Sequence, residues 1–236
     1  MSGTGDRVKE ALKWLERHGT RRTRDQMLSR YGITAPKAYG VPVGMIQQLG
    51  KRLGRDHRLA VALWQTGWYE ARMLTAFVDE PARVTAAQMD RWARDFDNWA
   101  IVDTLCFKLF DQTPHAWRKV EQWSRRREEF IRRAGFALLA CLALHDRQSG
   151  DRPFLRSLRL IEPAATDERN FVKKSVSWAL RALGRRSHAL NVASIELAQR
   201  LAKSEDATAR WLGRGALREL ANPALRRRLA ARARPS

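Results

Sequence analysis

The segment NFVKKSVSWALRALGRR, residues 170–186, shows the pattern that decides the fold class. Its apolar residues recur at intervals of three and four, the spacing that places side chains on one face of an α-helix. These residues are Val172, Val176, Ala179 and Leu183. The segment therefore predicts an amphipathic helix with one buried face.

The same period continues along almost the whole chain, and no segment alternates with period two for long enough to predict a strand. The segments expected to be helical are 5–18, 23–31, 42–53, 56–66, 68–79, 86–95, 98–110, 114–126, 128–145, 152–161, 168–184, 188–203, 206–220 and 223–233. The pattern predicts an all-α protein.

Several of these helix ends carry residues that commonly cap helices. Thr85 and Gln88 have the spacing of a capping box. Proline directly follows a capping residue at Thr113 and at Asn222, which predicts a helix start at each place. Gly184 lies where a helix C-cap is expected.

The elements and their connections are short, and no linker rich in Gly, Ser or Pro divides the chain. Helix pairs of about 30–45 residues follow one another, as in helical-repeat solenoids. We therefore expect one domain over residues 1–236, a curved solenoid of HEAT-like helical repeats with a basic concave face. A compact helical bundle is the competing architecture.

Residues 1–40 are expected to form N-terminal helices and a basic loop. The loop contains Lys37 and Tyr39. These residues either contact phosphates or belong to a solvated connector, and composition does not separate the two interpretations.

Lys and Arg number 45 against 25 Asp and Glu, so the formal net charge is +20. Like charges repel in a compact chain, so this excess favours a polyanionic partner, with nucleic acid as the first candidate. An anionic membrane surface is the second, although no apolar run approaches the roughly 20 residues of a spanning helix. The first residues lack the apolar core of a signal peptide, which predicts a cytoplasmic, nucleoid-associated protein.

The segment DNWAIVDTLCFKLF, residues 97–110, carries a carboxylate among apolar residues. Trp99 and Asp103 are four residues apart and share one helix face. Beside an aromatic ring, an ionised Asp103 could stabilise a positive sugar-like species or orient a water molecule. A structural ion pair with an arginine is the alternative.

The segment 170–186 carries a second unusual aromatic residue. Trp178 shares a stripe of its helix with Lys174, Arg181 and Arg185. Such a stripe is typical of a ring that packs on a nucleic-acid sugar while cations bind phosphates. A solvated face is the alternative.

Arg133 lies where the segment RRREEFIRRAGFALLACL, residues 125–142, becomes fully apolar. An arginine in this position pairs with a carboxylate or binds an anion, and Asp103 is one possible partner. The sequence has no P-loop, dinucleotide-binding, HExxH or CxxC motif, and the two cysteines, Cys106 and Cys141, suggest buried thiols rather than a metal site.

At these clusters the chain resembles the AlkD-like DNA alkylation repair enzymes, a family of helical-repeat DNA glycosylases. The likeness begins in KAYGVPVGMIQQLGKRL, residues 37–53, where the step from Tyr39 to Val41 matches an N-terminal signature. It continues through NWAIVD and FIRRAGFALLA and ends in residues 170–186, so it covers nearly the whole chain.

The resemblance implies hydrolysis of the N-glycosidic bond of cationic N3- or N7-alkylated purines, such as 3-methyladenine and 7-methylguanine, in double-stranded DNA during base excision repair. No pocket for a flipped base is implied. Trp99 and Trp178 would pack against the deoxyribose, Asp103 would stabilise the oxocarbenium ion and position water, and Arg133 would hold a phosphate or orient Asp103. A monomer is expected, without metal, cofactor, membrane or obligate protein partner.

The chain departs from the family's best-studied motif at the residues that flank Trp99, which are Asn98 and Ala100. Some relatives bind branched or distorted DNA without glycosylase activity, so a non-catalytic DNA binder is the second hypothesis. An RNA- or ribosome-associated scaffold is the third.

Overall fold

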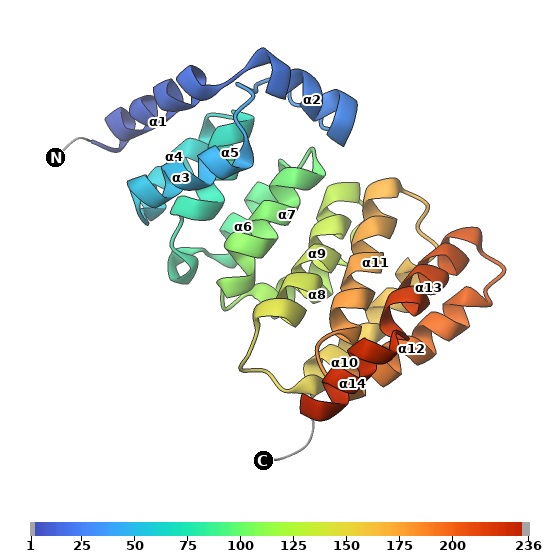
Figure 1. Ribbon diagram of the computed structural model, residues 1–236. Coiled ribbons are helices and arrows are strands. Elements are labelled where there is room, and N and C mark those ends of the chain that lie inside the picture. The colour runs from blue at the N-terminus through green and yellow to red at the C-terminus, as the bar shows by residue number, and fades with distance from the viewer. Residues whose placement is uncertain (1–2, 233–236) are drawn as a thin grey trace. The chain divides into compact units, whose positions relative to one another are not determined.

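The computed structural model describes residues 3–232, which form fourteen α-helices and three short 3-10 helices and contain no strand (Figure 1). The all-α prediction is confirmed. All fourteen predicted helices are present, with ends within three residues of the predicted ones. The chain divides after His115 into two compact units. The single-domain organisation stays a prediction.

The first unit is built around α5, which packs against α3, α4 and α7. Most of α5 is buried, including the charged Glu70. The α-helices of this unit are α1 (Thr4–His18), α2 (Arg21–Tyr31), α3 (Val43–Leu53), α4 (His57–Gln65), α5 (Tyr69–Val78), α6 (Ala86–Arg94) and α7 (Trp99–Lys108). Short 3-10 helices span Pro81–Arg83 and Phe110–Gln112.

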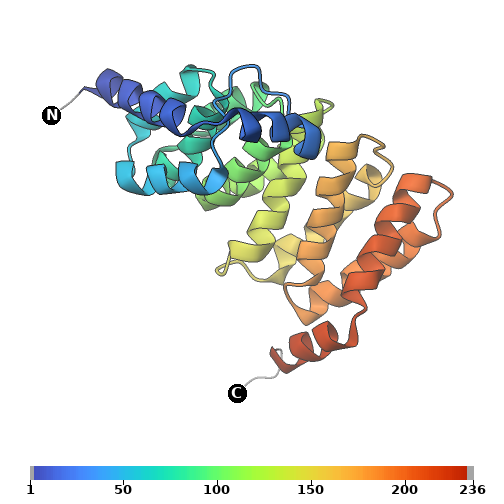
Figure 2. The ribbon, with the colours of Figure 1, turned by 45° about the horizontal axis from the view of Figure 1, so that its top comes forward.

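The second unit is built around α9 and α11, which pack along each other and lie side by side in both views (Figures 1 and 2). Helix α9 also packs on α8, and α11 also packs on α12 and α13. The α-helices of this unit are α8 (Ala116–Trp123), α9 (Glu129–His145), α10 (Asp151–Ile161), α11 (Asn170–Gly184), α12 (His188–Ala202), α13 (Ala207–Leu220) and α14 (Pro223–Arg232). A 3-10 helix spans Glu162–Ala164.

The apolar face expected for residues 170–186 is buried in α11. Its four residues, Val172, Val176, Ala179 and Leu183, are all 0% exposed. Gly184 is the last residue of α11 and Arg185 occupies the cap position, so the expected C-cap lies one residue later. A side chain at Gly184 would collide with Leu220 of α13, so close packing accounts for this glycine.

The predicted capping box at the start of α6 is only half formed. The hydroxyl of Thr85 accepts a hydrogen bond from the backbone N–H of Gln88, at 3.1 Å. The side-chain amide of Gln88 donates to the buried carboxylate of Asp79, at 2.8 Å, instead of returning to the helix start. A tertiary partner therefore takes the second half of the local motif.

The two predicted helix starts with proline have different outcomes. Helix α14 begins at Pro223, and the side chain of Asn222 accepts from the N–H of Ala224 at 2.8 Å, so this prediction is confirmed. The start predicted at Thr113 is wrong, because α8 begins at Ala116. The hydroxyl of Thr113 donates to the carbonyl of Phe110 at 2.8 Å and so closes the preceding 3-10 turn.

Trp211 of α13 lies outside the core and is 46% exposed. The buried residues of α13 are Ala209, Leu212, Gly213, Ala216 and Leu220. At about 100° per residue these lie on the face opposite Trp211. The ammonium group of Lys173 lies 5.8 Å from the centre of the indole ring.

Helices α12 and α13 pack at backbone distance at Gly213. A Cβ atom at this position would lie 2.6 Å from the carbonyl oxygen of Ala198, which is shorter than van der Waals contact. The backbone nitrogen of Ala202 would also be too close. Both neighbours are backbone atoms of α12, which cannot move independently of that helix. The pair therefore requires a residue without a side chain here.

Two glycine substitutions in α13 should have opposite effects on stability. Gly213→Ala should lower the free energy of unfolding by roughly 1–3 kcal/mol through overpacking. Gly215→Ala should raise it by about 0.5–1 kcal/mol, because the new Cβ meets nothing closer than the Arg218 guanidinium at 4.0 Å and alanine favours the helix. Urea unfolding of both proteins tests this, and shifts of the same sign would contradict it.

Candidate nucleic-acid interface

The start of α7 is fixed by the side chain of Asn98, which is 2% exposed. Its amide oxygen accepts hydrogen bonds from the backbone N–H groups of Ala100 and Ile101, at 3.1 and 3.0 Å. Its amide nitrogen donates to the carboxylate of Asp97, at 2.6 Å. This double cap sets where the helix begins and therefore where Trp99 and Asp103 are presented.

Trp99 and Asp103 lie one turn apart on α7, and both side chains are half-buried. The side of the helix opposite them carries the buried Ile101 and Leu105, and the flanking Val102 and Cys106 are buried as well. Solvent therefore reaches the indole ring and the carboxylate along the same face. The separation of four residues therefore places Trp99 and Asp103 on one face of α7, as the sequence predicted.

The orientation of the Trp99 ring depends on the end of α2. Its indole N–H donates to the backbone carbonyl of Tyr31 at 2.9 Å. Helix α2 ends here because Gly32 adopts a left-handed conformation with φ 61°, which allows the N–H of Ile33 to bond to the carbonyl of Met27. The last carbonyls of a helix lack partners within it, and Trp99 supplies one for Tyr31.

Removing this hydrogen bond while keeping an aromatic ring should loosen the end of α2. In Trp99→Phe we expect amide hydrogen exchange over residues 28–33 to become roughly 3- to 10-fold faster, as the loss of one hydrogen bond implies. Trp211→Phe is the matched control because that ring is exposed on α13. Unchanged exchange over residues 28–33 in Trp99→Phe would show that the bond does not hold α2.

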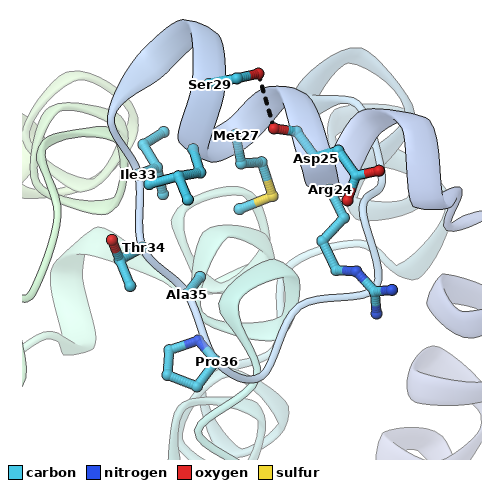
Figure 3. A pocket seen from close by; sticks show the side chains of 9 residues that line it. Arg24, Asp25, Met27, Ser29, Ile33, Thr34, Ala35 and Pro36 are labelled. Atoms are coloured by element: carbon cyan, nitrogen blue, oxygen red, sulfur yellow. Dashed lines mark hydrogen bonds between the residues drawn. The ribbon is translucent and has the colours of Figure 1, made fainter.

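Helix α2 itself is basic and exposed, and Met27 is its only buried residue. A hollow of about 460 Å³ lies beside it, lined by Met27, Ile33, Ala35 and Pro36 among others (Figure 3). The guanidinium of Arg24 extends to one side of this hollow. The lining is mostly apolar and contains none of the residues predicted to bind DNA.

The loop between α2 and α3 is held by the buried carboxylate of Glu70. This carboxylate accepts hydrogen bonds from the backbone N–H groups of Tyr39, Gly40 and Val41, at 3.0, 2.7 and 3.2 Å. These N–H groups are therefore occupied by an internal anion. The side chain of Lys37 is exposed, so the predicted phosphate contact from this loop depends on that side chain.

Tyr39 is half-buried and stacks on Trp68, with ring centres 4.0 Å apart and planes inclined by 6°. Burial raises the pKa of its hydroxyl, and the negative charges of Glu16 and Glu70 raise it further. Stacking of the Tyr39 ring on Trp68 therefore helps to hold the loop between α2 and α3 in place. Its predicted role in DNA binding stays a prediction.

Replacing the carboxylate of Glu70 should destabilise the first unit. Glutamine has one acceptor oxygen and would direct an NH₂ group at N–H donors, so Glu70→Gln should lower the free energy of unfolding by roughly 2–3 kcal/mol. Glu10→Gln on the exposed part of α1 is the matched control. Equal stability of the two variants in urea would rule out the anchoring role of Glu70.

The stripe predicted around Trp178 is present on α11. Trp178 is half-buried and Lys174 is exposed. Arg181 and Arg185 both pair with Glu219 of α13, at 3.2 and 2.6 Å. One carboxylate thus holds two of the predicted phosphate-binding cations beside the ring.

Arg133 joins α9 to the first turn of α11. It is 6% exposed, and its Nη1 atom donates to the carbonyl of Phe171 at 2.7 Å. Nearby, Asp167 pairs with Arg132 and Arg169, at 3.2 and 2.6 Å. Burial alone would raise the pKa of Asp167, but the hydrogen bonds of Arg169 and the positive charges of Arg169 and Arg132 bring it below its ordinary value.

The sequence did not reveal a hydrogen bond between the side chains of His57 and Asp79. The His57 ring lies 2.7 Å from the carboxylate of Asp79, which is fully buried. Burial raises the pKa of Asp79 above its ordinary value, although the contacts with His57 and Gln88 act in the opposite direction. The pair joins the start of α4 to the end of α5, which indicates a structural role.

The predicted residues fall into groups within each unit. The first unit carries Trp99 and Asp103 on α7 and Lys37 and Tyr39 on the loop after α2. The second unit carries Arg133, Lys174, Trp178, Arg181 and Arg185. A single active site that uses both groups stays a prediction.

Within residues 3–232, no group of three His, Cys, Asp or Glu side chains could hold a metal ion. Cys106 and Cys141 are buried free thiols. No helix in the described part of the chain is long and apolar enough to cross a membrane.

The fold is that of the HEAT-like repeat proteins related to DNA glycosylases. A solved structure with TM-score 0.76 covers 93% of this chain and 96% of its own, at 19% sequence identity. It is described as a member of "a new family of proteins related to the HEAT-like repeat DNA glycosylases with affinity for branched DNA structures".

The sequence profile of the family "DNA alkylation repair enzyme" matches residues 11–220 of this chain. This chain therefore belongs to the DNA alkylation repair enzyme family, as the resemblance predicted. A search of curated proteins found no significant match.

Proposed function

We propose that the protein is a monofunctional DNA glycosylase that hydrolyses the N-glycosidic bond of cationic N3- or N7-alkylated purines in duplex DNA. The observation that carries the proposal is the half-buried carboxylate of Asp103, one turn from Trp99 on α7. The indole of Trp99 is held by the carbonyl of Tyr31. Both side chains are accessible to a sugar that packs on this face.

The chemistry suits a single carboxylate. An alkylated purine that already carries a positive charge leaves as a neutral base, so its departure requires no strong general acid. The deoxyribose then develops oxocarbenium character, which a nearby negative charge stabilises. Water adds its oxygen to the anomeric carbon, and its proton passes to the carboxylate of Asp103 or to solvent.

The charge of the chain supports DNA as the partner. The formal net charge of +20 favours a polyanion whose counterions are released on binding. In the second unit, exposed Lys174 and the two arginines held by Glu219 flank Trp178. We assign phosphate contacts to these cations and sugar contact to Trp178, following the resemblance. Buried Arg133 would act by positioning the start of α11.

Asp103→Asn separates catalysis from binding. It should lower single-turnover release of 7-methylguanine from methylated duplex roughly 100-fold or more, because the amide cannot stabilise positive charge. DNA affinity should be unchanged or slightly higher, because a negative charge near the phosphates is removed. Asp6→Asn, at an exposed position of α1, is the matched control and should behave as wild type.

Equal release rates for wild type and Asp103→Asn would remove Asp103 from the mechanism. Unfolding midpoints for both variants would show that a lost rate does not reflect a lost fold.

A non-catalytic DNA binder is the second candidate. The solved structure of similar fold is described as having affinity for branched DNA. A binder would use the same cations and aromatic faces without the charge of Asp103. Tight binding of a four-way junction by wild type, with no release of methylated bases, would support this alternative.

A further inference from the structure

A hollow of about 440 Å³ lies in the second unit, where α9 and α11 end and α10 begins. Four arginines line it: Arg147, Arg185, Arg186 and Arg228. Its apolar lining includes Leu144, which is 37% exposed. A basic rim around an accessible apolar surface suits an anion attached to a compact organic group.

Arg186 is the fixed cation of this hollow. Its guanidinium donates to the carbonyls of Ala143 and Ser149, at 3.2 and 2.7 Å, and lies 3.9 Å from the centre of the Phe154 ring. Its Nε atom is buried and has no hydrogen-bond partner among the described residues. The charge is therefore held in place before any ligand arrives.

The electrostatics of Arg186 favour an added anion. Burial lowers the pKa of its guanidinium from the ordinary value. The charge of Arg147 lowers it further, whereas Asp146 and Asp151 act in the opposite direction. The positive charge is thus incompletely compensated in the protein itself, and a bound anion would stabilise it.

The other three arginines are exposed at the rim. Arg185 pairs with Glu219 at 2.6 Å, and Asp151, which also lines the hollow, accepts a hydrogen bond from the hydroxyl of Ser187 at 2.6 Å. The four arginines therefore have two carboxylates near them, Asp151 in the lining and Glu219 paired with Arg185. Guanidinium groups bind phosphate oxygens through paired N–H donors, so phosphate is the anion that this rim fits best.

Helix capping does not account for the whole cluster. An arginine near a helix C-terminus commonly satisfies the last carbonyls, and Arg186 does so for Ala143 of α9. Arg147 and Arg228 do not cap the last carbonyls of α9 or α11. Arg228 comes from α14 and lines the hollow from a different element.

The hollow continues the face of α11 that carries Trp178. Arg185 follows Trp178 by seven residues, which is about two turns and leaves the two side chains within roughly 20° of each other around the helix. At 1.5 Å per residue, they are about 10 Å apart along the axis. A strand of duplex DNA advances about 3.4 Å along the duplex axis per nucleotide and also winds around that axis, so these two positions would meet parts of one strand within a few nucleotides of each other.

We propose that this hollow binds one backbone phosphate of the DNA, within a few nucleotides of the sugar that packs on Trp178, with the adjoining deoxyribose against Leu144. The proposal rests on the proposed function only in taking DNA as the ligand and Trp178 as a sugar contact. It adds an anchor that holds the strand beside the lesion.

Two double variants with the same loss of charge test the site. Arg147→Ala with Arg228→Ala removes two exposed cations of the rim. Arg152→Ala with Arg226→Ala removes two exposed cations from the same helical regions that do not line the hollow. Thermal unfolding of both proteins shows whether each keeps its fold.

The first measurement is the affinity for an unmodified duplex as a function of salt. The rim variant should bind about tenfold more weakly than the control variant, as the loss of a charge-assisted contact implies. Its salt slope should be smaller than that of the control by about one ion. Equal affinities and slopes for the two double variants would overturn the proposal.

The second measurement locates the phosphate. Uncharged methylphosphonates are placed singly at each position around a 2′-fluoro-7-methylguanosine, whose fluorine slows cleavage of the glycosidic bond. Wild type and the control variant should lose affinity at one position within a few nucleotides of the lesion, and the rim variant should not. The same interference profile in all three proteins would also overturn the proposal.

A third measurement distinguishes DNA from free phosphate. Inorganic phosphate is compared with chloride at equal ionic strength in thermal unfolding. Stabilisation by phosphate that only the rim variant loses, together with equal DNA affinity of the two double variants, would assign the hollow to a free anion and overturn the DNA assignment. These experiments measure binding, so their outcome is independent of whether Asp103 supports base release.

Discussion

The helices of this protein approach one another at glycine, and this close contact determines which faces remain outside. In the first unit, a side chain at Gly50 of α3 would collide with Phe77 of α5. In the second, Gly135 of α9 lies against the backbone at Ser124, and Gly213 lies against α12. Packing at backbone distance leaves little freedom to rotate a helix about its axis. In α11, Gly184 lies in the same way against Leu220 of α13, which fixes the buried face of this helix and leaves the stripe that carries Trp178 outside the core.

A second constraint is the small number of acids available to a chain with a net charge of +20. Several carboxylates each hold more than one positive or N–H group. Glu70 accepts three backbone hydrogen bonds, Glu219 pairs with two arginines, and Asp167 pairs with two others. These contacts order the basic side chains without neutralising the surface. A phosphate backbone would then meet cations whose geometry is already restricted, which reduces the entropy lost on binding.

The sequence predicted the parts of this structure that depend on local spacing. The period of 3.6 gave all fourteen helices, and a separation of four residues placed Trp99 and Asp103 on one face. Prediction from the sequence failed where a distant partner competes for a local group. The side chain of Gln88 bonds to Asp79 rather than to the start of its own helix. Contacts between residues far apart in the chain, such as that of Trp99 with Tyr31, leave no local signal. Helix existence is therefore predictable here, whereas the support of the site is not.

The bond from Trp99 to Tyr31 gives a physical reason to favour an enzyme over a passive binder. An aromatic ring that only packs on a sugar gains most of its energy from buried area and tolerates many orientations. A ring beside a carboxylate that must face the anomeric carbon tolerates few, because electrostatic stabilisation depends on where the charge develops. The structure restrains this indole from two sides, through the Asn98 cap beneath it and the end of α2 at its N–H. A restraint of this kind supports the proposal that Asp103 acts on a sugar packed against the ring.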